Sequence, residues 1–588
     1  MLKILKRLGK REMVFSFICL LFIVFQVWLD LRLPDYMSEV TKLVQTKGTV
    51  VEDVIVPGLK MLACALGSLI ASIIVGYFVS LIAAGFSKNL RRDIFRKVQD
   101  FSMEEIKRFS TSSLITRTTN DVGQVQMLIA MGLQVIIKAP ITAVWAILKI
   151  LGKSWQWSLV TAGAVFVLLV VITILIAVVL PRFKKVQRLT DEINEVTREN
   201  LTGIRVVRAF NAEKYQEDKF DKVNIDLTNT QMFNQRVMAI MSPVMSTIMA
   251  SISLAIYWIG AYLINSANML DKITLFSDMV VFSSYAVQVV MSFMLLSFIF
   301  ILYPRAAVSA RRIVEVLDTS SRIKDGNISK VDKVQEENKG TVEFKNVSFK
   351  YPDAEEYMLE NISFKAKTGQ TVAFIGSTGS GKSTLINLIP RFYDATDGEV
   401  LVDGINVKEY TQEFLHEKIG YISQKAVMFD GTVESNVTYG MEETSSNASE
   451  ENVLSALNIA QATEFVSKME KGIDSHIARG GTNVSGGQKQ RLSIARAIAK
   501  RPDIYIFDDT FSALDYQTDF KLRKALNDEM ANATVLIVAQ RIGTIKNADE
   551  IIVLDEGKIV GKGTHEELIK NCEVYLQIAR SQLSEEEI

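Results

Sequence analysis

The first half of the chain contains apolar stretches that are too long to be strands or helices of a small soluble domain. A membrane-spanning helix needs about 20 apolar residues, because the hydrocarbon layer is about 30 Å thick and offers no hydrogen-bond partners to a free backbone. The stretches that meet this requirement are residues 14–33, 56–86, 127–151, 157–181, 237–264 and 275–303. The sequence therefore predicts an N-terminal all-α domain of six transmembrane helices.

Basic residues are distributed unevenly among the segments that join these stretches. Segments 88–117 and 182–236 are rich in Lys and Arg, whereas segment 34–53 is net acidic. The positive-inside rule then predicts that both basic segments and both termini lie in the cytoplasm. Residues 1–12 are basic and precede a span too long for a signal peptide, so we expect an interfacial helix there. The expected location is the cell (cytoplasmic) membrane, crossed several times.

The overall composition excludes several other classes of protein. The chain has 588 residues, and its 66 basic and 66 acidic residues cancel, which disfavours a nucleic-acid partner. Cys19, Cys64 and Cys572 are far apart, and the three histidines are equally dispersed. We therefore expect neither a disulfide framework nor a zinc site.

The second half of the chain has a different pattern. Segment 306–340 is polar, and from residue 341 onward short apolar strands alternate with helices, which is typical of an α/β domain with a mostly parallel sheet. The predicted organisation is an interfacial helix at 1–12, a transmembrane domain at 13–305, a linker at 306–340, an α/β domain at 341–580 and a polar tail at 581–588.

A glycine-rich segment follows the apolar strand 371–375 and precedes an apolar helix. Its residues are Gly376, Ser377, Thr378, Gly379, Ser380, Gly381, Lys382, Ser383 and Thr384. The pattern G-x-x-x-x-G-K-[ST] in this context is a P-loop, whose backbone amides and helix N-terminus bind phosphates. We expect Lys382 to reach the β- and γ-phosphates of ATP and the Ser383 hydroxyl to bind Mg²⁺. Domain 341–580 is thus predicted to be an α/β P-loop nucleotide-binding domain.

A second apolar strand, residues 503–507, is followed by Asp508 and Asp509. A carboxylate at the tip of a buried strand beside a P-loop suits Mg²⁺. We therefore predict that Asp508 is the acid on the metal side of the nucleotide site.

Further motifs resemble those of ATP-binding-cassette (ABC) ATPases. Residues 484–491 read V-S-G-G-Q-K-Q-R and are similar to the signature motif of that family, with Ser485, Gly486, Gly487 and Gln488 at its centre. Tyr351 resembles the adenine-stacking aromatic, Gln424 the Q-loop glutamine, and residues 512–515 the D-loop. With the six spans, the whole chain resembles a half-transporter of the ABC exporters, in particular those of bacterial multidrug exporters.

The resemblance implies a fold, cofactors and a second subunit. It implies an α-helical subdomain specific to ABC proteins, ATP and Mg²⁺ as cofactors, and Gln424 as a further metal ligand beside Ser383 and Asp508. It also implies a dimer in which each ATP lies between one subunit's P-loop and the other's signature motif, with Ser485 and the amides of Gly486 and Gly487 at the γ-phosphate. Segments 110–122 and 211–216 resemble the coupling helices that contact the nucleotide-binding domains.

Two residues depart from the family's pattern. Asp509 stands where the family usually has the glutamate that polarises the attacking water, and Gln540 stands where it has a histidine. A carboxylate retracted by about 1 Å is a poor base, and an amide cannot carry the charge of an imidazolium. The candidate catalytic residues are therefore Asp509, Gln540 and Gln424, at a site expected to bind ATP but to hydrolyse it slowly.

Both departures lie on this chain's own P-loop side, whereas its signature motif is intact. This asymmetry is what one half of a heterodimeric exporter would have, with hydrolysis mainly at the partner's site. A homodimer in which Asp509 suffices as the base stays open, as does an ATP-binding regulatory subunit with little turnover of its own.

The substrate is less constrained. Met and aromatic residues in the last two spans suit amphipathic small molecules such as drugs and dyes, but they suit helix packing or contact with membrane lipid equally well. A lipid flippase is a second possibility. Lys138 and Asp278 lie within or near spans and either face a cavity or reach the membrane surface.

Overall fold

The computed structural model of the chain consists of two compact units. The first comprises Met1–Gln99 and Ser112–Thr319, and the second comprises Asp100–Thr111 and Ser320–Ile588. The structure describes residues 2–46, 48–151, 154–297, 299–330, 336–442 and 446–584. Part of the expected linker (331–335) and part of the expected tail (585–588) lie outside the described residues.

The first unit is helical over almost all of its described length. Its helices are α1 (Leu2–Leu5), α2 (Lys10–Gln45), α3 (Val51–Gln99), α5 (Thr111–Thr116), α6 (Val122–Leu151), α7 (Trp155–Thr202), α8 (Ile204–Ala209), α9 (Glu213–Ala239), α10 (Met241–Ser266), α11 (Met269–Ser297) and α12 (Ile299–Asp318). The described residues contain six helices that are long and apolar enough to cross a membrane. The prediction of six transmembrane helices is confirmed.

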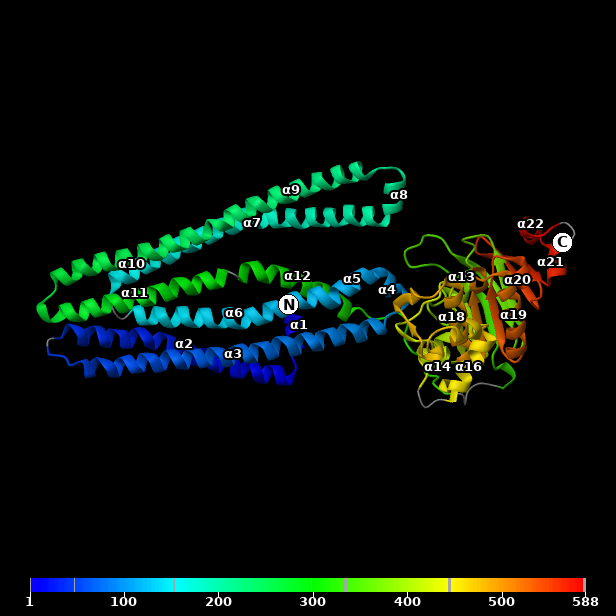
Figure 1. Cartoon of the computed structure of the whole chain (residues 1–588), viewed down its shortest axis with the longest axis horizontal. Coiled ribbons are helices and arrows are strands. Elements are labelled where there is room, and N and C mark those ends of the chain that lie inside the picture. The colour runs from blue at the N-terminus through cyan, green and yellow to red at the C-terminus, as the bar shows by residue number, and fades with distance from the viewer. Residues whose placement is uncertain are drawn as a thin grey trace. The chain divides into compact units, whose positions relative to one another are not determined.

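These helices pack in two groups. Helices α2, α3, α6 and α11 lie side by side, and α7, α9 and α10 run together (Figure 1). On α3, the side chains of Leu62, Leu66, Leu69 and Ile73 are each more than half exposed. Their spacing of three and four residues places them on one face of the helix. An exposed apolar face of this kind fits contact with lipid.

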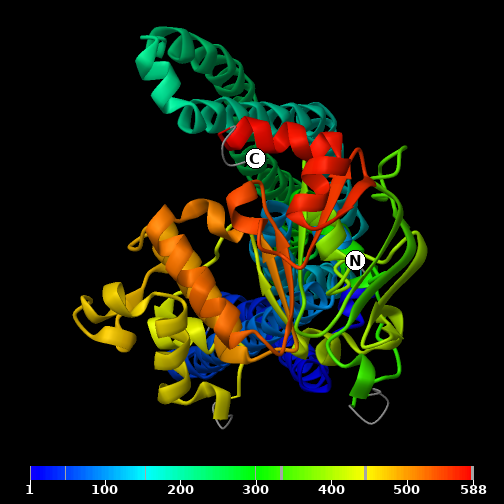
Figure 2. The ribbon, with the colours of Figure 1, turned by 90° about the vertical axis from the view of Figure 1, so that its right-hand side faces the viewer.

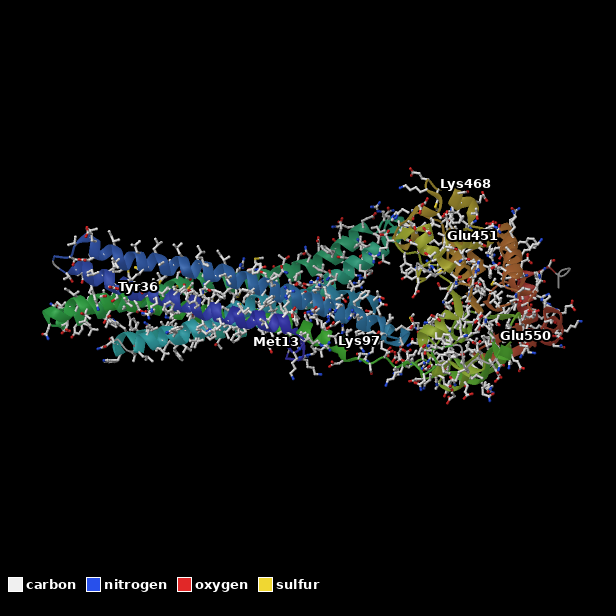
Figure 3. The ribbon with its side chains drawn as sticks, turned by 90° about the horizontal axis from the view of Figure 1, so that it is seen from below. Met13, Tyr36, Lys97, Glu451, Lys468 and Glu550 are labelled. Atoms are coloured by element: carbon white, nitrogen blue, oxygen red, sulfur yellow. The ribbon has the colours of Figure 1, made fainter. Side chains whose placement is uncertain are left out.

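Several helices extend beyond the predicted spans. α3 continues through the basic segment to Gln99, with Lys97 in its last turn (Figure 3), and α7 continues to Thr202. α12 runs to Asp318, so the first part of the segment expected as a linker is helical. These helices can continue past the apolar segments because acidic and basic side chains at helical spacing stabilise exposed helices.

The segment predicted as the first coupling helix, 110–122, does not form one short helix. Those residues form α5, a π-helical turn (Arg117–Asp121) and the start of α6, and from Ser112 onward they belong to the first unit. The short helix that belongs to the second unit is instead α4 (Met103–Phe109). It begins with a capping box between Ser102 and Glu105, and it ends at Ser110, whose φ of 55° breaks the helix.

The second unit contains two main β-sheets. A six-stranded sheet has the order β12-β11-β3-β10-β9-β6 and is parallel except for the β11–β12 pair, and a four-stranded antiparallel sheet has the order β2-β1-β4-β5. The strands are β1 (Val342–Phe349), β2 (Leu359–Ala366), β3 (Thr371–Gly376), β4 (Asp397–Val402), β5 (Ile405–Asn406), β6 (Ile419–Ile422), β7 (Gly431–Thr432), β8 (His476–Ile477), β9 (Ile504–Asp508), β10 (Thr534–Val538), β11 (Glu550–Asp555) and β12 (Lys558–Gly563). The predicted α/β domain is confirmed.

Helices lie beside these sheets in the second unit. They are α13 (Lys382–Asn387), α14 (Gln412–Glu417), α15 (Val433–Val437), α16 (Glu450–Ile459), α17 (Thr463–Ser467), α18 (Gly486–Lys500), α19 (Tyr516–Glu529), α20 (Ile542–Ile545), α21 (His565–Asn571) and α22 (Glu573–Gln582). In Figure 2 the yellow and orange helices α16, α18 and α19 lie on one side of the central strands, and the green strands of the antiparallel sheet lie on the other.

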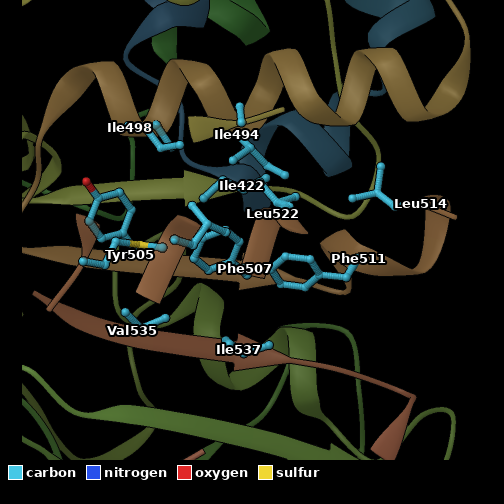
Figure 4. Packing of buried hydrophobic residues seen from close by; sticks show 14 of the residues in the cluster. Ile422, Ile494, Ile498, Tyr505, Phe507, Phe511, Leu514, Leu522, Val535 and Ile537 are labelled. Carbon is cyan, nitrogen blue, oxygen red and sulfur yellow. The ribbon is translucent and has the colours of Figure 1, made fainter. Parts of the chain in front are cut away.

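A buried apolar cluster joins the six-stranded sheet to these helices. Ile494 and Ile498 of α18 and Leu522 of α19 pack over Tyr505 and Phe507 of β9 (Figure 4). Burial of such side chains stabilises the fold by about 1.5–3 kcal/mol each. The cluster holds the C-terminal ends of β9 and β10 in place, and the chemically important residues follow those ends.

Candidate functional site

The P-loop lies between β3 and α13. The Lys382 ammonium donates hydrogen bonds to the carbonyl oxygens of Gly376 at 2.9 Å and Ser377 at 2.7 Å. Burial lowers the pKa of Lys382, and the charges of Asp509 and Asp508 oppose that shift. The cation is therefore held inside the loop, close to the carboxylates of Asp508, the last residue of β9, and of Asp509, which follows it.

The shape of the loop depends on glycine. Ser377, Thr378, Gly379 and Ser380 form a turn in which the Ser380 amide donates to the Ser377 carbonyl at 3.2 Å. At Gly381 the φ angle is +94°, and a Cβ there would lie 2.7 Å from Cδ2 of Leu359. A left-handed conformation costs an L-residue roughly 1–2 kcal/mol, and the steric contact adds to that cost. Glycine is required at this point of the loop.

Two of the predicted metal ligands come together. The Ser383 hydroxyl at the start of α13 donates to Oδ1 of Asp508 at 2.8 Å. Burial raises the pKa of Asp508, and the hydrogen bond from Ser383 opposes this. A hydroxyl and a carboxylate that converge beside a phosphate-binding loop are the oxygen ligands that Mg²⁺ prefers. The residues present therefore fit Mg²⁺.

The third predicted metal ligand points to a different carboxylate. Nε2 of Gln424 donates to Oδ2 of Asp509 at 3.2 Å, and Nε2 of Gln540 donates to the same oxygen at 2.9 Å. Asp509 itself has a left-handed backbone, with φ of 45°, and its amide donates to the Val538 carbonyl at 2.9 Å. We call this arrangement of Asp509, Gln424 and Gln540 the amide clamp.

The electrostatics of Asp509 follow from its position. Its residue exposure is 8%, and burial raises the pKa of its carboxyl above the ordinary value. The hydrogen bond from Gln424 and the hydroxyl of Ser512 oppose this shift, and so do the charges of Lys382 and Arg541. A small cavity of about 10 Å³ adjoins Asp509 and Gln540. That volume is at the lower limit for one water molecule.

Tyr351 belongs to an aromatic group next to the P-loop. Its hydroxyl and that of Thr384 are 3.0 Å apart, and its ring meets the ring of Tyr393 edge-on, with 5.4 Å between centroids. The ammonium of Lys107, on α4, lies 4.7 Å from the centroid of the Tyr351 ring. These contacts fix the orientation of the Tyr351 ring at the edge of the P-loop.

Lys107 and Tyr393 were not predicted as site residues. Tyr393 follows the P-loop helix in the sequence, and an aromatic residue at that place indicates a nucleotide-site residue only weakly. Lys107 lies in another part of the sequence, beside Tyr351 only because α4 belongs to the second unit. No local pattern around Lys107 indicates this contact.

The signature motif forms the N-terminus of α18. Ser485 caps that helix: its hydroxyl accepts from the amide of Gln488 at 3.3 Å, and its own amide donates to the Gln488 side chain at 2.9 Å. Ser485 and Gly486 are exposed, and Gly487 and Gln488 complete the first turn. The positive end of a long helix is thus open to solvent, which suits an incoming phosphate.

Comparison with known proteins gives the family. Residues 16–303 match the ABC transporter transmembrane region, and residues 359–512 match the ABC transporter nucleotide-binding family. An ABC transporter ATP-binding protein of Mycobacterium tuberculosis, named as uncharacterised, is 40% identical over 527 residues, or 90% of this chain and 88% of that protein. The chain belongs to the ABC transporter family.

Two further relatives and one solved structure are also similar to this chain. YfiB of Bacillus subtilis, also named as an uncharacterised ABC transporter ATP-binding protein, is 35% identical over 90% of both chains. The ATP-dependent lipid A-core flippase of Haemophilus ducreyi is 32% identical over 88% of this chain and 87% of its own length. A bacterial Atm1-family ABC exporter with ATP bound has the same fold, with a TM-score of 0.82 and 22% identity over 98% of this chain and all of that one.

The family and the fold together establish the general activity. The chain is a half-transporter of the ABC exporter type, a multi-pass membrane protein with an ATP-hydrolysing domain that drives transport.

Proposed function

We propose that this chain is one half of a heterodimeric exporter of amphipathic small molecules in the cytoplasmic membrane, with both termini in the cytoplasm. Its own P-loop site binds ATP and hydrolyses it slowly. Its signature motif serves the competent site of a partner half-transporter. An interfacial position of the basic segment 1–12, in which Leu2–Leu5 form a short helix and α2 begins at Lys10, is part of this proposal.

The amide clamp is the observation that carries the proposal. A general base needs a lone pair directed at the attacking water, within about 2.6–3.2 Å. Oδ2 of Asp509 accepts hydrogen bonds from Gln424 and Gln540, which leaves only the other oxygen of the carboxylate for the water. A hydrogen bond to a charged group contributes about 1.5–3 kcal/mol, so displacing both amides is costly. The clamp therefore supports a site that keeps its ATP intact.

Nucleotide binding itself needs none of the residues that differ from the family. Lys382 lies in the loop that would hold the β- and γ-phosphates, and Tyr351 offers a ring face for the adenine. Ser383 and Asp508 would hold Mg²⁺, and Gln424 would join them as a third oxygen ligand only at the cost of one hydrogen bond of the amide clamp. When bound there, Mg²⁺ would neutralise charge on the phosphates. The site is thus equipped to hold ATP.

The exposed N-terminus of α18 supports the role given to the partner. Ser485 and the amides of Gly486 and Gly487 would bind the γ-phosphate of the ATP held by a second subunit. A partner with glutamate and histidine at the two altered positions would complete one competent site.

Purification of the chain alone and with such a partner tests the proposal. We expect slow ATP hydrolysis by the chain alone and fast, drug-stimulated hydrolysis by the co-expressed pair. The partner is found by affinity purification from native membranes. Rapid hydrolysis by the isolated chain would instead support a homodimer in which Asp509 is a sufficient base.

A lipid flippase is the second candidate. The observation in its favour is the name of several relatives, since the proteins from Haemophilus ducreyi and Pseudomonas aeruginosa, at 32% and 31% identity, are lipid A-core flippases. Reconstitution with labelled lipids separates the two functions: lipid translocation without dye transport favours the flippase.

A regulatory subunit is the remaining alternative. It is favoured if ATP binding to this chain changes the partner's activity without transport.

A further inference from the structure

Four charged side chains in the first unit form two ion pairs between α2 and α6. Nζ of Lys138 lies 3.3 Å from Oδ2 of Asp30, and Nζ of Lys149 lies 2.6 Å from Oδ2 of Asp35. Both helices are predicted and observed spans. Ionisable side chains within spans are rare because they are costly to bury, and they usually mark a functional site.

The pair formed by Asp35 and Lys149 has a structural role. Lys149 is close to the end of α6 at Leu151. The hydroxyl of Tyr285, from α11, donates to Oδ1 of Asp35 at 2.6 Å and lies 2.9 Å from the Leu31 carbonyl oxygen. This pair therefore ties three helices together with short contacts near one end of the spans.

The ion pair formed by Asp30 and Lys138 differs from the Asp35–Lys149 pair in its position along the spans and in its contact distance. The Lys138 backbone precedes Leu151 by 13 residues, or about 20 Å along α6, whereas Asp30 precedes Asp35 by five residues, or about 7.5 Å along α2, so the lysine starts deeper in the layer than the carboxylate that it reaches. Its contact with Asp30 is longer, and Ser68 of α3 donates to the other oxygen of Asp30. The side chains of Lys138 and Asp30 keep 33% and 28% of their exposure, so a ligand can reach both charges.

Two methionines lie on the same face of α6 as Lys138. Met131 and Met127 precede Lys138 by seven and eleven residues, and the exposed side chain of Gln134 lies on that face between Lys138 and Met131. Met131 is 50% exposed and Met127 is 47% exposed. Methionine side chains adapt to ligands of irregular shape. The ion pair, the Gln134 amide and the two adaptable methionines thus follow one another along the helix.

We propose that the Asp30–Lys138 pair binds the headgroup of zwitterionic amphiphiles, with the ammonium at Asp30, an acidic group such as phosphate at Lys138 and the apolar chain along Met131 and Met127. A zwitterionic headgroup replaces both partners of the pair. A headgroup with one charge satisfies one partner and leaves the other charge uncompensated in an apolar layer, which is strongly unfavourable. This inference rests on the proposed export of amphipathic molecules and names their class.

Three probes with the same twelve-carbon chain test the selectivity. Dodecylphosphocholine is zwitterionic, dodecyltrimethylammonium is cationic and dodecyl phosphate is anionic. The full-length protein is placed in nanodiscs of phosphatidylglycerol, and binding of each probe below its micelle concentration is measured by calorimetry without ATP. We expect the zwitterionic probe to bind about tenfold more tightly than either of the others, a modest factor because the pair is partly exposed. Equal binding of all three would overturn the proposal.

Two double variants relate that selectivity to the pair. Asp30→Asn with Lys138→Met removes both charges and should abolish the preference, whereas Asp30→Lys with Lys138→Asp restores a pair in reverse and should retain it. The matched control, Asp35→Asn with Lys149→Met, removes the other ion pair and should leave the preference intact. A preference that survives removal of Asp30 and Lys138, or that is lost equally in the control, would refute the assignment.

The source of the ligand is tested by changing the membrane. In nanodiscs that contain phosphatidylethanolamine, weaker apparent binding of dodecylphosphocholine would identify a membrane lipid as the occupant. Unchanged binding would identify a water-borne amphiphile, and both results support the site. Because these measurements need neither ATP nor a partner, their failure is distinguishable from failure of the heterodimer proposal, which ATP hydrolysis tests.

Discussion

Reversal of the two departures at the P-loop site should convert a slow nucleotide site into a fast one. The perturbation is Asp509→Glu combined with Gln540→His. The longer carboxylate advances the base by about 1 Å, and the imidazole replaces an amide that donates to Oδ2 of Asp509 at 2.9 Å. Both changes act on the same oxygen atom of the amide clamp.

The magnitude follows from those contacts. A base displaced by about 1 Å can lose about 10²-fold in rate. Release of one charge-assisted hydrogen bond, about 1.5–3 kcal/mol, corresponds to roughly 10- to 150-fold. The two residues touch, so their effects are not additive. We expect either single substitution to raise turnover by roughly 10- to 10²-fold, and the double substitution to raise it by about 10²-fold or more.

The assay is phosphate release by the purified chain in nanodiscs at saturating ATP and Mg²⁺, measured on the dimer fraction. Lys382→Ala in the double variant should abolish the gain, because the Lys382 ammonium lies in the phosphate-binding loop. The matched control, Asp528→Glu with Gln577→His, makes the same chemical changes at two exposed positions and should have no effect. A double variant no faster than the original chain would refute the reasoning about the clamp.

Three further predictions concern other parts of the nucleotide-binding unit. Ser485→Ala should leave ATP binding to this chain unchanged but slow hydrolysis by the pair at least tenfold, measured as phosphate release, since a helix-terminal donor to phosphate is worth about 10²-fold. Gly381→Ala should weaken ATP binding, measured with a fluorescent nucleotide, because φ there is +94°. Burial lowers the pKa of His416, so the folded protein binds a proton there less readily than the unfolded chain does. The free energy of unfolding should therefore decrease as the pH drops below 6.5. His416→Gln should flatten that fall in the thermal unfolding midpoint.

The sequence by itself determined the class of the protein and the identity of its nucleotide site. Six apolar stretches imply spans because lipid leaves no other choice for the backbone, and the P-loop has a local geometry that a short pattern dictates. The convergence of Ser383 and Asp508 was also expected from the sequence, and the two residues meet at the C-terminal ends of β3 and β9, parallel strands with β10 between them.

Contacts between distant segments were decided only by the tertiary structure. Gln424 and Gln540 are far apart in the sequence, yet both amides reach one oxygen of Asp509 because β6, β9 and β10 are adjacent in the sheet. In the same way, Asp30 meets Lys138 only because α2 packs against α6. A local pattern carries no information about which distant side chain completes a pair, because that depends on packing of whole helices and strands.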